Sequence, residues 1–219
     1  MRTDEELAAR VAADVPDCSY VNLGVGLPQQ VAGHIPPDRE VMFHSENGIL
    51  GIGGDAPPGH EDWELVDAGK RAVVLREGGC FFHHADSFAM VRGHHLDLTI
   101  LGAYEVSVKG DLANWWTGST EVIPGVGGAM DLAVGARKVY VMMRHVTSSG
   151  APRMRTQCRL PLTGSGVVSR IYTDLCVAEP RGTHFEVLEL APGVSAEQVT
   201  ELTEGDVTFS DRAGTAAFR

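Results

Sequence analysis

The amino-acid sequence predicts one α/β domain over residues 1–219, with a largely parallel sheet flanked by helices. Three observations support this prediction. Short apolar runs of strand length alternate along the chain with segments of helical periodicity, which is the pattern of strand–helix–strand units. Two glycine clusters stand immediately before helical segments. No internal repeat, low-complexity tract or long Pro/Gly/Ser linker divides the sequence into separate units.

The first helix and strand have clear boundary residues. Thr3, followed by three acidic residues, is a typical helix start, and apolar residues at helical spacing continue until Pro16. Tyr20–Gly26 is typical of a buried strand that ends in a glycine turn, and Pro28 is placed to begin the helix Gln29–Gly33. A glycine turn that leads into a helix start presents backbone N–H groups, which suit an anionic ligand.

The glycines of this turn do not complete a dinucleotide-binding fingerprint. The motif begins at Gly24 and Gly26, but its third glycine would fall at Gln29. No acid that would bind a ribose is clearly placed downstream. We therefore expect no Rossmann-type NAD site.

The second predicted strand, Val41–Ser45, delivers Glu46 to the carboxyl edge of the sheet, where α/β proteins bind ligands. Four glycines follow, and they predict a loop against which a bulky or anionic ligand can lie. A free glutamate has a pKa of roughly 4.3, so its anion can attack an acyl carbon without a helper base. Glu46 is therefore a candidate nucleophile, and a helix cap or an ion pair is the alternative. The glycines are Gly48, Gly51, Gly53 and Gly54.

The next part of the chain alternates between turns and strands. Asp55–Asp62 is polar and rich in breaker residues, which predicts an exposed excursion. A turn that contains Lys70 precedes the apolar strand Ala72–Leu75, and by itself Lys70 is typical of a solvated turn residue. Two further strands are expected at Leu96–Leu101 and Ala103–Val108.

A second glycine cluster lies in Pro124–Asp131, directly before the helical segment Met130–Ala136. Unhindered N–H donors at a helix start suit an oxyanion, and a plain loop-to-helix junction is the alternative. Lys138–Met143 is typical of a buried strand, and Gln198–Leu202 is expected as the last helix.

Several side chains of types that bind metals or cofactors lack the spacing of a site. The histidines of His83–His84 and His94–His95 are adjacent, whereas metal ligands on a helix stand three or four residues apart. Trp115–Trp116 could stack on an adenine ring, but we favour packing. We expect no metal site and no bound cofactor. The cysteines form no Cys-x-x-Cys pair and are expected as buried free thiols; they are Cys18, Cys80, Cys158 and Cys176.

Charge and hydropathy exclude several classes of partner. The formal net charge is −11 and no Lys/Arg run is present, so nucleic-acid binding is not expected. No window approaches the roughly 20 apolar residues that span a bilayer, and the start has no apolar signal core. We expect a cytoplasmic protein with no membrane partner.

The run Ser45–Gly48, followed by Ile49–Leu50–Gly51, resembles the active-site signature of the 3-oxoacid CoA-transferase B (β) subunit family. The resemblance extends from about Val21 to Val207. Within it, His83–Gly93 resembles the 3-oxoadipate branch of the family more than the acetoacetate or succinate branches. Further matching segments are Cys158–Gly164, Val167–Val177 and Phe185–Val194.

The resemblance implies the chemistry and the site. Glu46 would form a glutamyl-CoA thioester, and the backbone of Gly128 and Ala129 would stabilise oxyanions. The implied reaction moves coenzyme A, a substrate, from succinyl-CoA to a 3-oxo acid, for which we expect 3-oxoadipate. Acetoacetate as the acid, an acyl-CoA hydrolase and a non-catalytic CoA-binding protein are the alternatives. The residues implied to contact coenzyme A are Asn22, Gly24, Gly26, Asn47 and Lys70.

The resemblance also implies a partner. In this family the B (β) chain works with a separate A (α) chain, which completes the site and most of the acyl pocket. We therefore expect a heteromer of the form α₂β₂.

Overall fold

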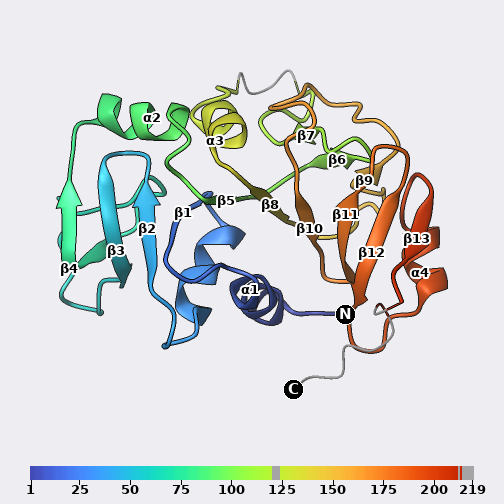
Figure 1. Ribbon diagram of the computed structural model, residues 1–219, viewed down its shortest axis with the longest axis horizontal. Coiled ribbons are helices and arrows are strands. Elements are labelled where there is room, and N and C mark those ends of the chain that lie inside the picture. The colour runs from blue at the N-terminus through green and yellow to red at the C-terminus, as the bar shows by residue number, and fades with distance from the viewer. Residues whose placement is uncertain (120–123, 212, 214–219) are drawn as a thin grey trace.

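The computed structural model describes residues 1–119, 124–211 and 213 (Figure 1). Within them, ten strands form one large sheet: β1 (Ser19–Leu23), β2 (Val41–Ser45), β3 (Ile49–Asp55), β4 (Val73–Phe81), β5 (Leu98–Leu101), β8 (Val139–Met142), β10 (Arg170–Tyr172), β11 (Cys176–Pro180), β12 (Phe185–Leu190) and β13 (Val207–Phe209). Their order across the sheet is β13-β12-β11-β10-β8-β5-β1-β2-β3-β4. A small sheet has the order β7-β6-β9, with β6 (Glu105–Ser107), β7 (Leu112–Ala113) and β9 (Met154–Arg155).

The centre of the large sheet is parallel, antiparallel pairs extend it on both sides, and the edge strand β13 is parallel to β12. β2, β1, β5, β8 and β10 are parallel neighbours, as the alternation of strands and helices predicts. β3 and β4 extend one side in antiparallel pairing, and β11 and β12 extend the other. The predicted α/β domain with a largely parallel sheet flanked by helices is therefore confirmed, with antiparallel strands added at both sides.

Helices cover both faces of the sheet (Figure 1). The helices are α1 (Asp4–Ala13), the 3-10 helix η1 (Leu27–His34), α2 (His84–Arg92), α3 (Ala129–Gly135) and α4 (Ala196–Glu201). α1 and η1 pack on one face with a core that includes Tyr140 and Met142 of β8. α2, α3 and the small sheet pack on the other face, where the alternating Val139 and Val141 point. An ion pair joins α2 to α3.

The expected first helix forms because both of its ends are satisfied. Thr3 and Glu6 make a capping box at the start of α1. At the other end, the guanidinium of Arg39 donates to backbone carbonyls of the last turn and of Val15, at 2.6–3.4 Å. Leu7 and Val11 are fully buried on the inner face of the helix.

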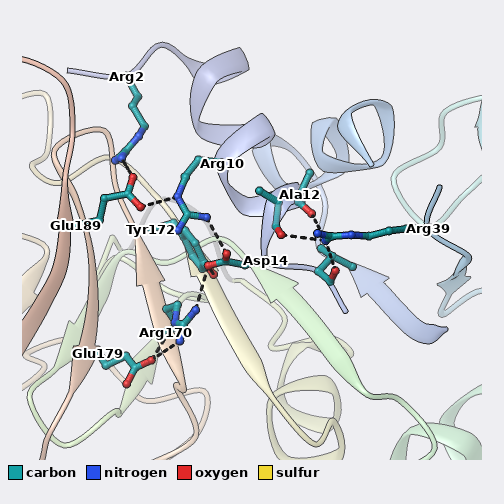
Figure 2. A network of polar contacts seen from close by, with 11 residues as sticks. Arg2, Arg10, Ala12, Asp14, Arg39, Arg170, Tyr172, Glu179 and Glu189 are labelled. Atoms are coloured by element: carbon teal, nitrogen blue, oxygen red, sulfur yellow. Dashed lines mark hydrogen bonds and ion pairs between the residues drawn. The ribbon is translucent and has the colours of Figure 1, made fainter. Parts of the chain in front are cut away.

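A polar network ties α1 to the far side of the sheet (Figure 2). Asp14, directly after α1, accepts hydrogen bonds from the Tyr172 hydroxyl at 2.7 Å and from Arg170 at 3.0 Å. Arg10 of α1 pairs with Asp14 at 2.9 Å and with Glu189 of β12 at 2.8 Å. The N-terminal helix is therefore fixed to β10 and β12, which lie more than 150 residues later in the sequence.

The glycine-rich run after Glu46 differs from its prediction. It is not a loop: Gly48 makes a tight turn, and the other glycines lie in β3. Gly48 has φ +115°, and a Cβ there would lie 2.2 Å from the carbonyl oxygen of Phe82. A Cβ on Gly51 would lie 2.8 Å from the Cα of Gly79 in β4. These glycines allow the backbone of a neighbouring segment to approach closely. A glycine-rich sequence does not show whether protein backbone or a ligand occupies the space that the missing side chains leave.

Other expectations are confirmed or corrected in detail. The excursion 55–62 is largely exposed. Trp115 and Trp116 are partly buried and pack on each other with ring centroids 5.9 Å apart. The expected strand Ala103–Val108 belongs to the small sheet, because β6 pairs with β7 and β9. All four cysteines are free thiols, but of these only Cys176 is buried, so that part of the prediction is wrong. No helix in the described residues is long and apolar enough to cross a membrane.

Candidate active site

Four parallel strands end at the same edge of the sheet, and the residues that follow them line one cavity. These residues are Gly24 after β1, Glu46 after β2, Gly102 after β5 and Met143 after β8. The cavity, here named the edge cavity, has a volume of about 510 Å³. This volume is in the usual range of about 300–1,000 Å³ for small-molecule sites. The edge cavity therefore stands where an α/β fold binds its ligands.

Glu46 lies in the tight turn that joins β2 to β3. The amide of Gly48 donates to the carbonyl of Ser45 at 3.0 Å, and the amide of Phe82 donates to the carbonyl of Gly48 at 3.0 Å. These bonds fix the backbone on both sides of the carboxylate-bearing residue. Among the described residues, no hydrogen bond or salt bridge engages the Glu46 carboxylate, so neither the cap nor the ion pair considered as alternatives is formed there.

Burial changes the ionisation of Glu46. Loss of contact with water raises the pKa of the Glu46 carboxyl, and the nearby charge of His84 acts in the opposite direction. The anion of Glu46 is consequently less stabilised by solvent than that of an exposed glutamate. A carboxylate in this condition is available to react with an electrophile in the edge cavity.

The glycine cluster before α3 packs directly against this carboxylate. A Cβ added to Gly128 would lie 3.0 Å from Oε2 of Glu46 and 2.7 Å from the ring of Phe88. Gly128 and Ala129 both line the edge cavity. Their N–H groups precede the first internal hydrogen bonds of α3, so they are free of the helix's own bonding. The structure therefore brings together the two stretches that the sequence singled out.

The glycine turn after β1 contributes one wall. The amide of Gly24 donates to the carbonyl of Ile100 at 2.8 Å, which holds the turn against β5. Gly24 lines the edge cavity, whereas Gly26 does not. Gly26 has φ +93°, and its amide donates to the side chain of Gln29 at 2.9 Å. The turn thus shapes the cavity through its backbone.

Asn22 lies beneath the site and does not line the edge cavity. Its side chain is 2 % exposed and contacts the ring of His44 at 3.2 Å and the hydroxyl of Thr99 at 3.3 Å. The other ring nitrogen of His44 lies 2.9 Å from the hydroxyl of Ser87 in α2. We name these four side chains the buried polar row. Burial lowers the pKa of His44 to about 4, so its ring is neutral. A contact of Asn22 with coenzyme A stays a prediction.

Asn47 and Lys70 lie together on the other flank of the Glu46 turn. The exposed side chain of Asn47 donates to the carbonyl of Val66 at 2.7 Å, and the amide of Ala68 donates to the Ser45 hydroxyl at 2.8 Å. Residues 66–70 therefore lie beside the turn. Lys70 is exposed with φ +63°, next to a second cavity of about 240 Å³ that Gly69 lines. Neither residue lines the edge cavity, so their contacts with coenzyme A also stay predictions.

Two arginines line the edge cavity that the sequence pattern did not indicate as site residues, Arg144 and Arg153. Arg144 pairs with Asp4 and with Asp174, the latter at 3.7 Å. Arg153 donates from Nη1 to the carbonyl of Ala103 at 2.9 Å, while its Nε is buried without a hydrogen-bond partner among the described residues. A buried donor left unpaired costs about 1–3 kcal/mol. No local pattern marks Arg153, because the pairing of β9 with β6 brings it to the cavity from elsewhere in the chain.

Within the described part of the chain, no three His, Cys, Asp or Glu side chains gather in a way that would hold a metal ion. The edge cavity offers a substrate the Glu46 carboxylate, the glycine backbone and the Arg153 guanidinium, which has no ion-pair partner among the described residues. This combination suits acyl transfer to a carboxylate nucleophile.

Comparison with known protein families agrees with this geometry. A model of the family described as Coenzyme A transferase matches residues 4–202. The B chain of 3-oxoadipate CoA-transferase from Acinetobacter baylyi is 52 % identical over 92 % of the chain and 93 % of its own length. The same-named protein of Pseudomonas putida is 54 % identical over 90 % and 92 %. The B chain of succinyl-CoA:3-ketoacid coenzyme A transferase from Helicobacter pylori is 47 % identical over 92 % and 97 %.

Solved structures share the fold at low sequence identity. An acyl-CoA transferase of Escherichia coli O157:H7 has a TM-score of 0.75 at 16 % identity over 97 % of this chain, which spans only 42 % of that larger one. Glutaconate coenzyme A-transferase of Acidaminococcus fermentans has a TM-score of 0.66 at 17 % identity, over 97 % of this chain and 88 % of that one. The decarboxylase AibA/AibB has a TM-score of 0.67 at 21 % identity, over 96 % and 86 %. The shared fold thus occurs with more than one reaction.

The family assignment depends on the sequence matches, since they cover nearly the whole chain at about half identity. The matches begin earlier in the chain than the resemblance seen around the Glu46 signature, because the family model includes α1. The chain therefore belongs to the coenzyme A transferase family and is a CoA-transferase.

Proposed function

We propose that this protein is the β chain, carrying the catalytic glutamate, of a transferase that moves coenzyme A from succinyl-CoA to 3-oxoadipate. One observation carries the proposal: the Glu46 carboxylate, which has no hydrogen-bond or ion-pair partner among the described residues, lines the edge cavity with the backbone of Gly128 packed against it. The relatives named for 3-oxoadipate CoA-transferase support the choice of acid. The relatives named for succinyl-CoA and 3-ketoacids support the donor and keep acetoacetate as the alternative acceptor.

The first half of the proposed reaction loads the enzyme. An oxygen of Glu46 attacks the thioester carbon of succinyl-CoA, and the C–S bond breaks to give a mixed anhydride and the CoA thiolate. The thiolate then attacks the glutamyl carbonyl carbon, and succinate leaves with the anhydride oxygen. Glu46 now holds coenzyme A as a thioester. The acceptor acid reverses the two steps, so one thioester is exchanged for another without ATP.

Each attack produces a tetrahedral oxyanion beside the glutamate. In the proposal, the amides of Gly128 and Ala129 donate to this oxyanion, because their backbone lies against the Glu46 carboxylate. Donors of this kind contribute about 3 kcal/mol each where their removal has been measured in other enzymes. The edge cavity excludes part of the solvent, which strengthens these bonds.

The proposed enzyme works with a second kind of chain. The relatives are named as the B chains of their enzymes, which supports a partner of the A (α) type that binds beside the open edge cavity. An α₂β₂ assembly is our proposal for its composition, and the cytoplasmic location stays a prediction.

The decisive experiment measures the intact mass of this chain, co-purified with its partner, after mixing with succinyl-CoA without an acceptor. We expect an added mass of coenzyme A on the wild-type chain, no addition on Glu46→Ala, and discharge by 3-oxoadipate. Faster discharge by acetoacetate would move the assignment to a succinyl-CoA:3-ketoacid transferase.

Two results would contradict the transferase mechanism. Steady release of free coenzyme A without an acceptor acid would indicate a hydrolase. An active complex of the correct composition that never forms the adduct would leave Glu46 with a structural role only.

A further inference from the structure

Arg153 enters the edge cavity from a rigid support. Its amide donates to the carbonyl of His145 at 3.1 Å, and its carbonyl accepts from the amide of Val106 at 2.9 Å. The next residue, Met154, is paired with Val106 in the small sheet. The guanidinium is further fixed by the bond from Nη1 to the carbonyl of Ala103. Arg153 therefore presents its remaining donors at a set position.

Within the part of the chain that the structure describes, no carboxylate balances the charge of Arg153. Among the described residues no carboxylate pairs with it, and its buried Nε has no hydrogen-bond partner. Nearby arginines differ: Arg144 of the same cavity faces Asp4 and Asp174. Arg155, two residues along, also has a buried Nε without a hydrogen bond to any described residue, but it forms ion pairs with two glutamates. Arg153 is thus a partly buried cation at the cavity whose Nε is enclosed and whose Nη2 has no hydrogen-bond partner among the described residues, so that Nη2 can donate to a carboxylate in the cavity.

The other residues of the edge cavity indicate which kind of carboxylate Arg153 can bind. Glu46 reacts at one part of the wall, and Arg153 stands at another. Leu101, Leu132 and Met142 contribute apolar surface to the same cavity. In a short acyl chain with a carboxyl group at each end, the methylene groups can contact the apolar wall while the two ends meet Glu46 and Arg153.

We propose that Arg153 binds the second carboxylate of a dicarboxylic acyl group while Glu46 reacts with the first. Arg153 thereby sets a preference for dicarboxylic over monocarboxylic acids. The inference rests on the proposed function, since it assigns a specificity determinant to the same cavity.

The test compares two acceptor acids in the complete complex of this chain with its partner. Because the reaction passes through a covalent enzyme form, kcat/KM for the acceptor does not depend on the donor. We expect Arg153→Gln to lower kcat/KM for the dicarboxylic 3-oxoadipate on the order of 100-fold, since a site built around a charged group is sensitive to its loss. For the monocarboxylic acetoacetate we expect a decrease of less than about threefold, as no group pairs with Arg153 in that case.

Two variants accompany this comparison. Arg153→Lys retains the charge but not the fork of donors, and should lie between wild type and Arg153→Gln for 3-oxoadipate. Arg181→Gln removes an equal charge from the turn after β11. That turn lies beside the start of β10, at the opposite edge of the sheet, so both rates should match wild type.

A binding measurement separates this inference from the proposed reaction. Calorimetric titration of succinate into the complex, without coenzyme A, should show binding to wild type and its loss in Arg153→Gln, with acetate bound weakly by both. If wild type forms no CoA adduct, the proposed function fails, and the succinate titration still decides the role of Arg153. Equal losses for both acceptor acids, unchanged rates, or unaltered succinate binding in Arg153→Gln would each overturn the assignment.

Discussion

At the scale of single residues, the site depends on how closely a backbone approaches one carboxylate. Glu46 keeps its carboxylate free of protein donors among the described residues, and Gly128 fills the adjacent space with backbone alone. A side chain at that position would have to displace either Glu46 or Phe88. The glycine is therefore required by the carboxylate beside it and not by its own backbone angle, since φ at Gly128 is −77°.

Gly128→Ala tests this requirement. The added methyl group would lie 3.0 Å from Oε2 of Glu46, so we expect the carboxylate to move and kcat to fall on the order of 100-fold. Gly125→Ala is the matched control, because a Cβ there meets no atom within 4 Å. Steady-state kinetics of the two variants gives the comparison. Equal activity of both would show that Glu46 tolerates displacement.

At the scale of elements, stability is concentrated where α1 meets the sheet. Asp14 connects α1 to β10 through Tyr172 and Arg170 (Figure 2). Tyr172 ends β10 and is paired with Met142, which lines the edge cavity, but its ring packs in the core on the α1 face and its hydroxyl donates to Asp14. Removal of the hydroxyl alone should consequently alter folding, because the backbone pairing of Tyr172 beside the cavity is retained.

Tyr172→Phe removes one hydrogen bond from this network. We expect the free energy of unfolding to fall by about 1.5 kcal/mol, because the partly buried Asp14 loses a donor at 2.7 Å but retains its arginines. Differential scanning calorimetry should show a Tm lower by about 3–6 °C. The control Tyr20→Phe alters a residue that is 46 % exposed and should leave Tm unchanged. An equal Tm for Tyr172→Phe and wild type would show that this hydrogen bond does not contribute to stability.

At the scale of the whole molecule, two buried histidines link stability to pH. Burial lowers the pKa of both His44 and His145 from 6.5 to about 4. The unfolded chain therefore takes up protons at a higher pH than the folded one, and stability present above pH 6.5 is lost as the pH falls to about 4. The full loss is about 3 kcal/mol for each histidine.

The variant His145→Gln isolates one of these contributions. The ring of His145 lies between Thr173 and Thr203, with ring nitrogens 3.0 Å from each hydroxyl, and does not line the edge cavity, although its backbone carbonyl accepts from Arg153. We expect the variant to lose less stability than wild type between pH 7 and pH 4.5, measured as the change in the free energy of unfolding by urea. Parallel stability curves for the two proteins would mean that His145 does not titrate in this window.

The sequence predicts the features of this fold that are local. Strand and helix periodicity, the Thr3 cap and the position of Glu46 after β2 all follow from neighbouring residues, and the structure contains each of them. The features it does not predict depend on contacts between distant segments. The glycines of β3 serve the approach of β4, and Arg153 reaches the cavity through the pairing of β9 with β6.

The site was predicted in part for the same reason. Glu46, Gly24 and the Gly128 segment follow strands or precede a helix, so their position could be worked out from the pattern, and they line one cavity. Asn22 has the sequence position of a site residue, but its strand turns the side chain into the buried polar row. Side-chain direction at a strand end depends on register with the neighbouring strands, which local sequence does not specify.

The buried polar row provides a natural spectroscopic probe. The ring of His44 is enclosed and neutral, and its Nε2 faces the Ser87 hydroxyl, so its N–H proton should exchange slowly with solvent. Such a proton gives a separate downfield resonance in a proton NMR spectrum. His44 stands two residues before Glu46, so this resonance should shift when the glutamate is acylated, while the signal of the distant His145 serves as an internal reference. The His44 resonance should therefore report, without isotope labelling, the fraction of Glu46 that is acylated during turnover.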